Sequence, residues 1–237
     1  MAAIIYSVRF LSAKKKLTIK QPVIAIEKDL TTILFYQKLS IADQPRFLKQ
    51  LNTFLQKVTV TAVNTTITDV DKILVAASAV IPMFAFDGWV YPRLEEVLLY
   101  NDHFNMDFET EGNEERNIMG LVGTGVYKNK MLLSKAAWQQ GFNSKTEKSN
   151  TAIHEFVHLI DGADGDTHGI PRILMDKQYV LPWINLVHKE LEDLKEGNSD
   201  INPYGYTNKA EFFAVVAEYF LSSQIFLKRS TLKCINK

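Results

Sequence analysis

The stretch His154–His158 reads His-Glu-Phe-Val-His, and it decides how the rest of this chain is interpreted. Residues four apart on an α-helix lie on the same face, so the imidazoles of His154 and His158 can reach one metal ion. Glu155 is rotated by about 100° around the helix and lies beside that ion. Asn150 is a favourable N-cap residue, and the apolar residues around the histidines predict a buried, rigid helix. This pattern indicates the ligands and the general base of a zinc hydrolase.

A zinc site of this kind needs a third protein ligand, because catalytic zinc usually takes three and leaves one position for water. Asp164, six residues after His158, has the spacing at which some zincins place that ligand. The alternative lies in residues 211–220, an apolar helical segment whose two carboxylates are Glu211 and Glu218. Both fall on one helix face, and a buried carboxylate is unfavourable unless a metal or a cation partners it. The spacing alone leaves all three candidates open.

Several segments of the chain resemble a known protein family. They are residues 154–162 and 202–214 (Asn-Pro-Tyr-Gly-Tyr-Thr-Asn-Lys-Ala-Glu-Phe-Phe-Ala), with further matches at 35–40, 73–82 and 138–142. In this order they resemble the Mlc titration factor A family of bacterial zinc peptidases, whose catalytic core is similar to the protease domain of anthrax lethal factor. The resemblance covers most of residues 30 to 225. It implies that Glu211 is the third zinc ligand, that Tyr204 faces the metal, and that Glu218 is a supporting carboxylate.

The resemblance and the motif together imply a zinc-dependent peptidase that binds one zinc ion per chain and acts on a peptide or protein substrate. Glu155 would take a proton from the attacking water and pass it to the leaving amine. Tyr204 would donate a hydrogen bond to the tetrahedral oxyanion. Tyr206 is the competing hydroxyl, because residues 202–205 have the composition of a turn whatever else they do. Exopeptidase and endopeptidase action both remain open.

The same resemblance implies contact with a transcriptional repressor. The alternative is therefore a regulatory binding protein that sequesters a repressor and keeps a latent or secondary peptidase site. An intact set of His154, Glu155, His158, Glu211 and Tyr204 favours the enzyme, because a binding protein needs neither a base nor an oxyanion donor beside a metal.

Polar residues that follow the motif in the chain could support the metal site or shape its surroundings. Asp161, three residues past His158, could accept the outer N–H of a metal-binding histidine or cap the end of the helix. Asp164, Asp166 and His168 belong to a polar, turn-prone segment, for which we expect a solvated loop at the rim of the cleft.

Composition narrows the classes of partner. The 237 residues carry 27 basic and 27 acidic side chains, so no net field favours direct binding to nucleic acid or to an anionic membrane. The single Cys234 excludes an intrachain disulfide and suits a reducing compartment. No apolar run is long enough to span a membrane, and we expect no signal peptide in the first residues, whose apolar run is short and whose positive charges follow it. We therefore expect a cytoplasmic protein.

The chain order predicts an α+β fold, a zincin-like metallopeptidase core with a small mixed sheet, an active-site helix and additional N-terminal helices. We expect a single domain at residues 29–225 between tails at 1–28 and 226–237. Besides the metal-binding helix, the pattern predicts helices at 29–39, 43–58, 71–81, 178–195 and 208–222. It predicts strands at 58–63, 97–100 and 130–134, with a loop at 120–125.

Substrate in such a core adds as a strand to a sheet edge, for which either residues 122–127 or residues 131–134 are candidates. The segment 120–127 is rich in glycine but lacks the Lys-Ser/Thr ending of a phosphate loop, so no nucleotide site is predicted there.

Overall fold

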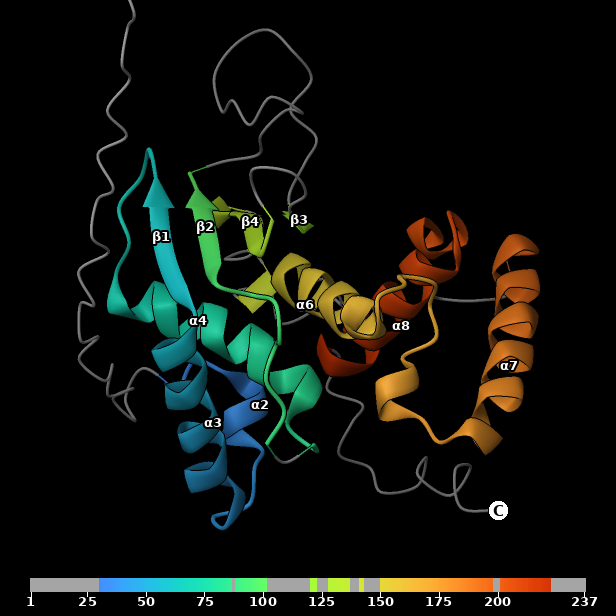
Figure 1. Cartoon of the computed structure of the whole chain (residues 1–237), viewed down its shortest axis with the longest axis horizontal. Coiled ribbons are helices and arrows are strands. Elements are labelled where there is room, and N and C mark those ends of the chain that lie inside the picture. Colours follow the sequence, from blue (N-terminus) through green and yellow to red (C-terminus); the bar gives the residue numbers. More distant parts are fainter. Residues whose placement is uncertain are drawn as a thin grey trace, which may run out of the picture.

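The computed structural model describes residues 30–86, 88–101, 120–122, 128–136, 141–142, 150–197 and 201–222. Within these ranges the chain forms one sheet and a set of helices around it, which confirms the predicted α+β class (Figure 1). No helix in the described ranges combines the length and the apolar character needed to cross a membrane. The tails predicted at 1–28 and 226–237 lie outside the described residues, as does Cys234.

The sheet has four strands in the order β1-β2-β4-β3. Strand β1 (Thr59–Val63) pairs parallel with β2 (Glu96–Tyr100), and β2 pairs parallel with β4 (Lys130–Ser134). Strand β3 (Gly120–Val122) pairs antiparallel with β4. The prediction of a small mixed sheet is therefore confirmed. In β2 and β4 four consecutive residues are buried, as expected for strands that are covered on both faces.

Strand β3 corrects the loop predicted at residues 120–125. Leu121 and Val122 pair with Leu132 and Met131 of β4, so these apolar residues extend the sheet despite the glycines around them. Residues 123–125 lie outside the described part of the chain. Because β4 is paired on both sides, residues 131–134 are wrong as a candidate edge, and the edge next to β4 is β3.

The N-terminal helices are α2 (Leu34–Gln37), α3 (Asp43–Lys57) and α4 (Asp69–Val80). Helix α3 matches its prediction. Helix α4 begins two residues earlier than predicted, because Thr68 and Asp71 form a reciprocal capping box at its start. The helix predicted at 29–39 is interrupted at residues 31–33 and ends at Gln37. Ile33 is extended, with φ −87° and ψ 104°, and the β-branched run Thr31-Thr32-Ile33 disfavours helix there.

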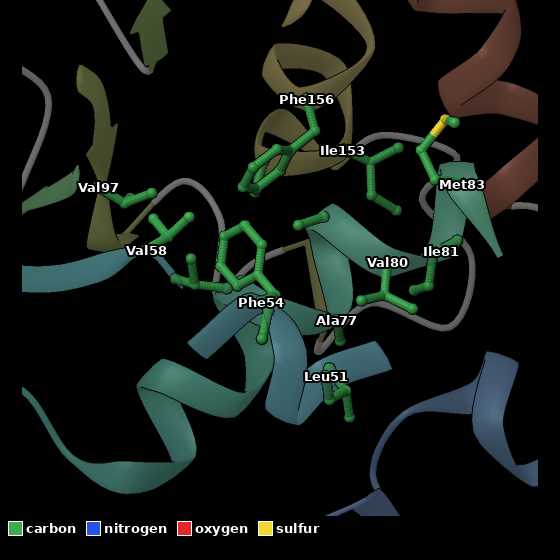
Figure 2. Close-up of a cluster of buried hydrophobic side chains, with 14 of the residues drawn as sticks. Leu51, Phe54, Val58, Ala77, Val80, Ile81, Met83, Val97, Ile153 and Phe156 are labelled. Carbon is green, nitrogen blue, oxygen red and sulfur yellow. The ribbon is translucent and has the colours of Figure 1, made fainter. Parts of the chain in front are cut away.

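The hydrophobic core lies where α3, α4, the sheet and α6 (Thr151–Asp161) meet. Figure 2 shows Phe54 of α3, Val80 of α4 and Phe156 of α6 turned into the same buried cluster. The rings of Phe54 and Phe156 are 5.7 Å apart in an edge-to-face arrangement. The core thus fixes the side of α6 that faces away from the two histidines.

Two further helices follow, α7 (Lys177–Lys195) and α8 (Lys209–Ser222), in agreement with the predicted ranges. Helix α6 lies between the sheet and α8, and α7 lies on the outer side of α8 (Figure 1). A short turn of 3-10 helix at Pro203–Tyr206 packs against α8. The pairing of α6 with α8 brings together the two segments that carry the candidate metal ligands.

Candidate metal centre

Helix α6 presents two histidine rings on one face. The Nε2 atoms of His154 and His158 lie 3.1 Å apart, as the spacing of four residues predicts. The opposite face of the helix is held by the core, in which Phe156 is fully buried. The helix begins at the predicted N-cap, where Asn150 Oδ1 accepts a hydrogen bond from the N–H of Ile153 at 3.1 Å. The histidines therefore stand on a rigid support.

Glu211, in the first turn of α8, completes a group of three. Its Oε2 lies 3.0 Å from His154 Nε2 and 3.3 Å from His158 Nε2. Hydrogen bonds from both imidazoles lower the pKa of Glu211 to about 2, although partial burial opposes that shift. Asn208 caps α8 by accepting the N–H of Glu211, which orients this first turn.

These three groups fit a zinc ion. Two neutral imidazoles and a carboxylate are ligands that zinc accepts, and bond lengths of about 2.0–2.1 Å place tetrahedral ligand atoms about 3.3 Å apart. The observed separations are 3.0, 3.1 and 3.3 Å. In the part of the chain that the structure describes, no other group of three or more such residues converges in this way. Asp164 is exposed and lies outside the group, so of the three candidates for the third ligand the structure brings Glu211 to the histidines.

Glu218, two helical turns beyond Glu211, contacts the side of His154 that faces away from the centre. Its Oε2 lies 3.3 Å from Nδ1 of His154, and its Oε1 accepts the backbone N–H of Asn150. Since a carboxylate can only accept, Nδ1 carries a proton, so in the neutral ring that binds a metal Nε2 is the free nitrogen, directed to the centre. Burial alone would lower the pKa of His154, but the hydrogen bonds to Glu211 and Glu218 outweigh it and raise that pKa to about 10.

A cleft opens over the two histidines and Glu211, and Glu155 is a buried residue of its wall. Burial raises its pKa above the usual value of a glutamate, and the nearby histidines oppose that shift. A carboxylate with a raised pKa is a better proton acceptor near neutral pH than an exposed one.

Tyr204 reaches the same cleft from the turn at Pro203–Tyr206. Its ring centre lies 6.1 Å from that of His154, and Asn202 Oδ1 holds the turn by accepting the N–H of Tyr204. Burial, Glu211 and Glu155 all raise the pKa of Tyr204, so its hydroxyl keeps its proton. Tyr204 lines the cleft, whereas Tyr206 does not. The structure thus brings Tyr204, and not its competitor, to the candidate metal ligands.

Asp161 takes a role that the sequence did not predict. Its Oδ2 accepts the N–H of Gly169 at 2.7 Å and so ties the loop after α6 to the end of that helix. It is not hydrogen-bonded to His158, whose Nδ1 has no hydrogen-bond partner among the described residues. Gly169 has φ +74°, and a Cβ added there would lie 2.2 Å from the carbonyl oxygen of Lys209. Gly169 therefore sets how closely this loop approaches the start of α8.

The cleft itself has a volume of about 930 Å³. One wall comes from residues 91–94, which precede β2, and from residues 128–130, which lead into β4; another comes from the loop after α6. Asp164 and Asp166 are exposed in that loop, as predicted, while His168 lines the cleft. Sequence reasoning missed the basic residues of the cleft, which are Arg93, Lys128, Lys130 and Lys209. Lys209 could have been noticed two residues before Glu211, but the other three depend on how β2 and β4 pair.

The fold and the cluster together define an α+β protein with a candidate catalytic metal centre. The chain belongs to the family of glucose-regulated metallo-peptidases M90, whose model matches residues 11–234. An uncharacterized protein of Synechocystis sp., slr2042, is 28% identical over 196 residues, which cover 78% of this chain and 71% of that protein. The Mlc titration factor A of Pectobacterium atrosepticum is 29% identical over 79% of this chain and 71% of its own length. That of Salmonella arizonae is 28% identical over 82% and 81%. These matches confirm the predicted family.

Proposed function

We propose that this protein is a zinc-dependent peptidase in which His154, His158 and Glu211 hold one zinc ion and Glu155 is the general base. The observation that carries the proposal is the convergence of His154 Nε2, His158 Nε2 and Glu211 Oε2 within 3.0 to 3.3 Å of one another, beside a buried carboxylate. Membership of a metallo-peptidase family supports a metal at this place.

When bound, zinc supplies Lewis acidity, which lowers the pKa of water and polarises the carbonyl of a peptide bond. Glu155 accepts the proton of the attacking water on a carboxylate oxygen and returns it to the nitrogen of the leaving amine. Tyr204 donates its phenolic proton in a hydrogen bond to the oxygen that becomes negatively charged. Glu218 holds His154 in the tautomer whose Nε2 is free to bind the metal.

Strand β3 is our candidate for the edge that receives the substrate. It is the outer strand next to β4, and it packs against α6, the helix that carries the histidines. An extended peptide added antiparallel or parallel to β3 would lie along this helix. One hydrophobic core contains residues from Leu30 to Ala214, which supports a single zincin-like domain at residues 29–225.

A second candidate function is regulatory. Relatives of this chain are named Mlc titration factor A, which favours a role in binding a transcriptional repressor. In this alternative the chain sequesters a repressor and its peptidase site is latent or secondary. The two candidates differ in what they require of Glu155, because proton transfer needs its carboxylate and sequestration does not.

The experiment compares the parent protein with Glu155→Gln in a zinc assay and a peptide-cleavage assay. We expect about one zinc ion per chain in both proteins and a loss of rate on the order of a hundredfold or more in the variant. Equal cleavage by both proteins would assign the activity to a different site. Absence of stoichiometric zinc from the parent would contradict the metal assignment.

A further inference from the structure

The charged side chains that line the cleft are not balanced. Apart from Glu155 and Glu211 at the metal centre, the described lining holds no aspartate or glutamate. The same lining holds four basic side chains, which are Arg93, Lys128, Lys130 and Lys209. The whole chain has equal numbers of basic and acidic residues, so this excess of positive charge is a property of the cleft and not of the composition.

The basic residues lie on two sides of the metal centre. Arg93 and Lys128 precede β2 and β4, two parallel neighbours, so they lie at the same end of the sheet. The N–H of Glu95 donates to the carbonyl of Asn129 at 2.8 Å, and this hydrogen bond holds the segments before β2 and β4 side by side. Lys209 stands at the start of α8, two residues from Glu211. A peptide that crosses the metal centre therefore passes between basic side chains.

Within the described ranges, three of these cations have no ion-pair partner. Lys130 is paired with Glu96 at 2.7 Å. Arg93, Lys128 and Lys209 are exposed, and the described ranges contain no carboxylate in an ion pair with any of them. Unpaired cations around a concave site focus a positive potential there and favour ligands with carboxylates.

We propose that this cleft selects peptides that carry carboxylates next to the scissile bond, with Arg93 and Lys128 as specificity-determining residues. The inference rests on the proposed peptidase function. The carboxylates can belong to Asp or Glu side chains or to the free C-terminus of a short peptide, and both present the same chemistry to the cleft. An exposed ion pair contributes roughly a 2- to 5-fold preference, so two pairs together give a preference on the order of 10-fold.

The test uses zinc-loaded protein and peptides that are identical except for Glu or Gln on both sides of the scissile bond, each with a free or an amidated C-terminus. We expect kcat/KM to favour the Glu peptides about 10-fold at low salt and less at 0.5 M salt, because salt screens exposed charges. The double variant Arg93→Gln/Lys128→Gln should bring this ratio close to one. The matched control Arg172→Gln/Lys177→Gln removes the same two charges at exposed positions outside the cleft and should keep the ratio.

The outcomes separate the two proposals. A ratio near one in the parent, independent of salt and of amidation, would overturn the preference for carboxylates while leaving the peptidase function intact. If the protein prefers peptides with a free C-terminus over amidated ones but cleaves Glu and Gln peptides equally well, the cleft recognises the C-terminal carboxylate. If the parent cleaves no peptide, the peptidase proposal fails, and fluorescence polarisation with labelled Glu and Gln peptides still tests the cleft. Equal binding of both peptides would then refute the inference.

Discussion

Glu218 Oε2 lies 3.3 Å from Nδ1 of His154, on the side of the ring that faces away from Glu211. The imidazole is thus held between two carboxylates from one helix, which are two turns apart. The same Glu218 also accepts the N–H of Asn150, the N-cap residue of α6. One buried side chain of α8 therefore fixes both the ring orientation of a candidate ligand and the start of the helix that carries it.

Glu218→Gln should lower the affinity for zinc about 10-fold, because supporting partners of metal-binding histidines typically contribute 10- to 100-fold and the amide keeps part of the contact. The measurement is a competition titration with a chelator of known affinity. Glu192→Gln, an exposed charge change on α7, is the control and should have no effect. An unchanged affinity in Glu218→Gln would show that the contact does not orient His154.

Glu211→Gln should weaken zinc binding by about 10- to 100-fold or more, since it removes the anionic ligand from the group of three. Asp164→Asn should leave the affinity unchanged, because Asp164 is exposed and lies outside that group. Metal content after dialysis distinguishes the two variants. Loss of zinc from Asp164→Asn together with its retention in Glu211→Gln would overturn the assignment.

Gly169→Ala should reduce both stability and zinc affinity. The new Cβ would lie 2.2 Å from the carbonyl oxygen of Lys209, so the first turn of α8, with Glu211, must move. We expect a loss of about 1–3 kcal/mol in the free energy of unfolding from overpacking, in addition to the strain of a positive φ. Thermal or urea unfolding of the metal-free protein measures it.

Gly197→Ala is a close control for this change. Gly197 has φ +75°, against +74° for Gly169, but no atom lies within 4 Å of its added Cβ. The difference between the two variants isolates the contact with Lys209 from the backbone strain. Equal destabilisation would mean that the approach of the loop to α8 does not matter.

The sequence predicted the parts of the site that depend on local spacing. His154, Glu155 and His158 needed only the period of one helix, and Asn150 needed only the rules of helix capping. The choice of Glu211 over Asp164 depends on how α6 packs on α8, and the resemblance to a family supplied it where spacing left it open. The roles of Asp161 and Gly169 depend on the same packing, so no local signal indicated them.

The errors in the fold have a similar origin. Strand β3 is only three residues long, and its pairing with β4 outweighs a composition that indicates a loop. The segment before α2 contains apolar residues at helical spacing, but its β-branched run favours an extended backbone at Ile33. Arg93 and Lys128 are 35 positions apart and line the same cleft only because β2 and β4 pair in parallel.

Tyr204→Phe should lower kcat by about 10- to 100-fold. Removal of one oxyanion donor costs 10²- to 10³-fold in a buried site, and Tyr204 is 55% exposed, which weakens its contribution. Tyr206→Phe is the control, because Tyr206 is similarly exposed but lies outside the cleft lining. Steady-state kinetics on one peptide compares them. A larger loss in Tyr206→Phe would transfer the role to that residue.

Zinc binding should release about one proton from His154 at pH 7 to 8. In the metal-free protein its pKa is about 10, so the ring is protonated there, and zinc requires its neutral form. Glu211, with a pKa of about 2, is already ionised and releases none. The release should decline as the pH rises through about 10, where His154 loses its proton without metal. Titration calorimetry in buffers with different heats of ionisation measures the number of protons.

The same pKa shift fixes the sign of a change in stability. A histidine whose pKa rises from 6.5 to about 10 on folding stabilises the metal-free protein fully below pH 6.5, and this stabilisation disappears as the pH rises through 10. With saturating zinc the dependence should reverse, because protons then compete with the metal and higher pH favours binding. Melting temperatures of the two forms between pH 6 and pH 10 should therefore diverge as the pH increases. Parallel curves, with no proton released on binding, would show that the proton on His154 is not linked to the metal.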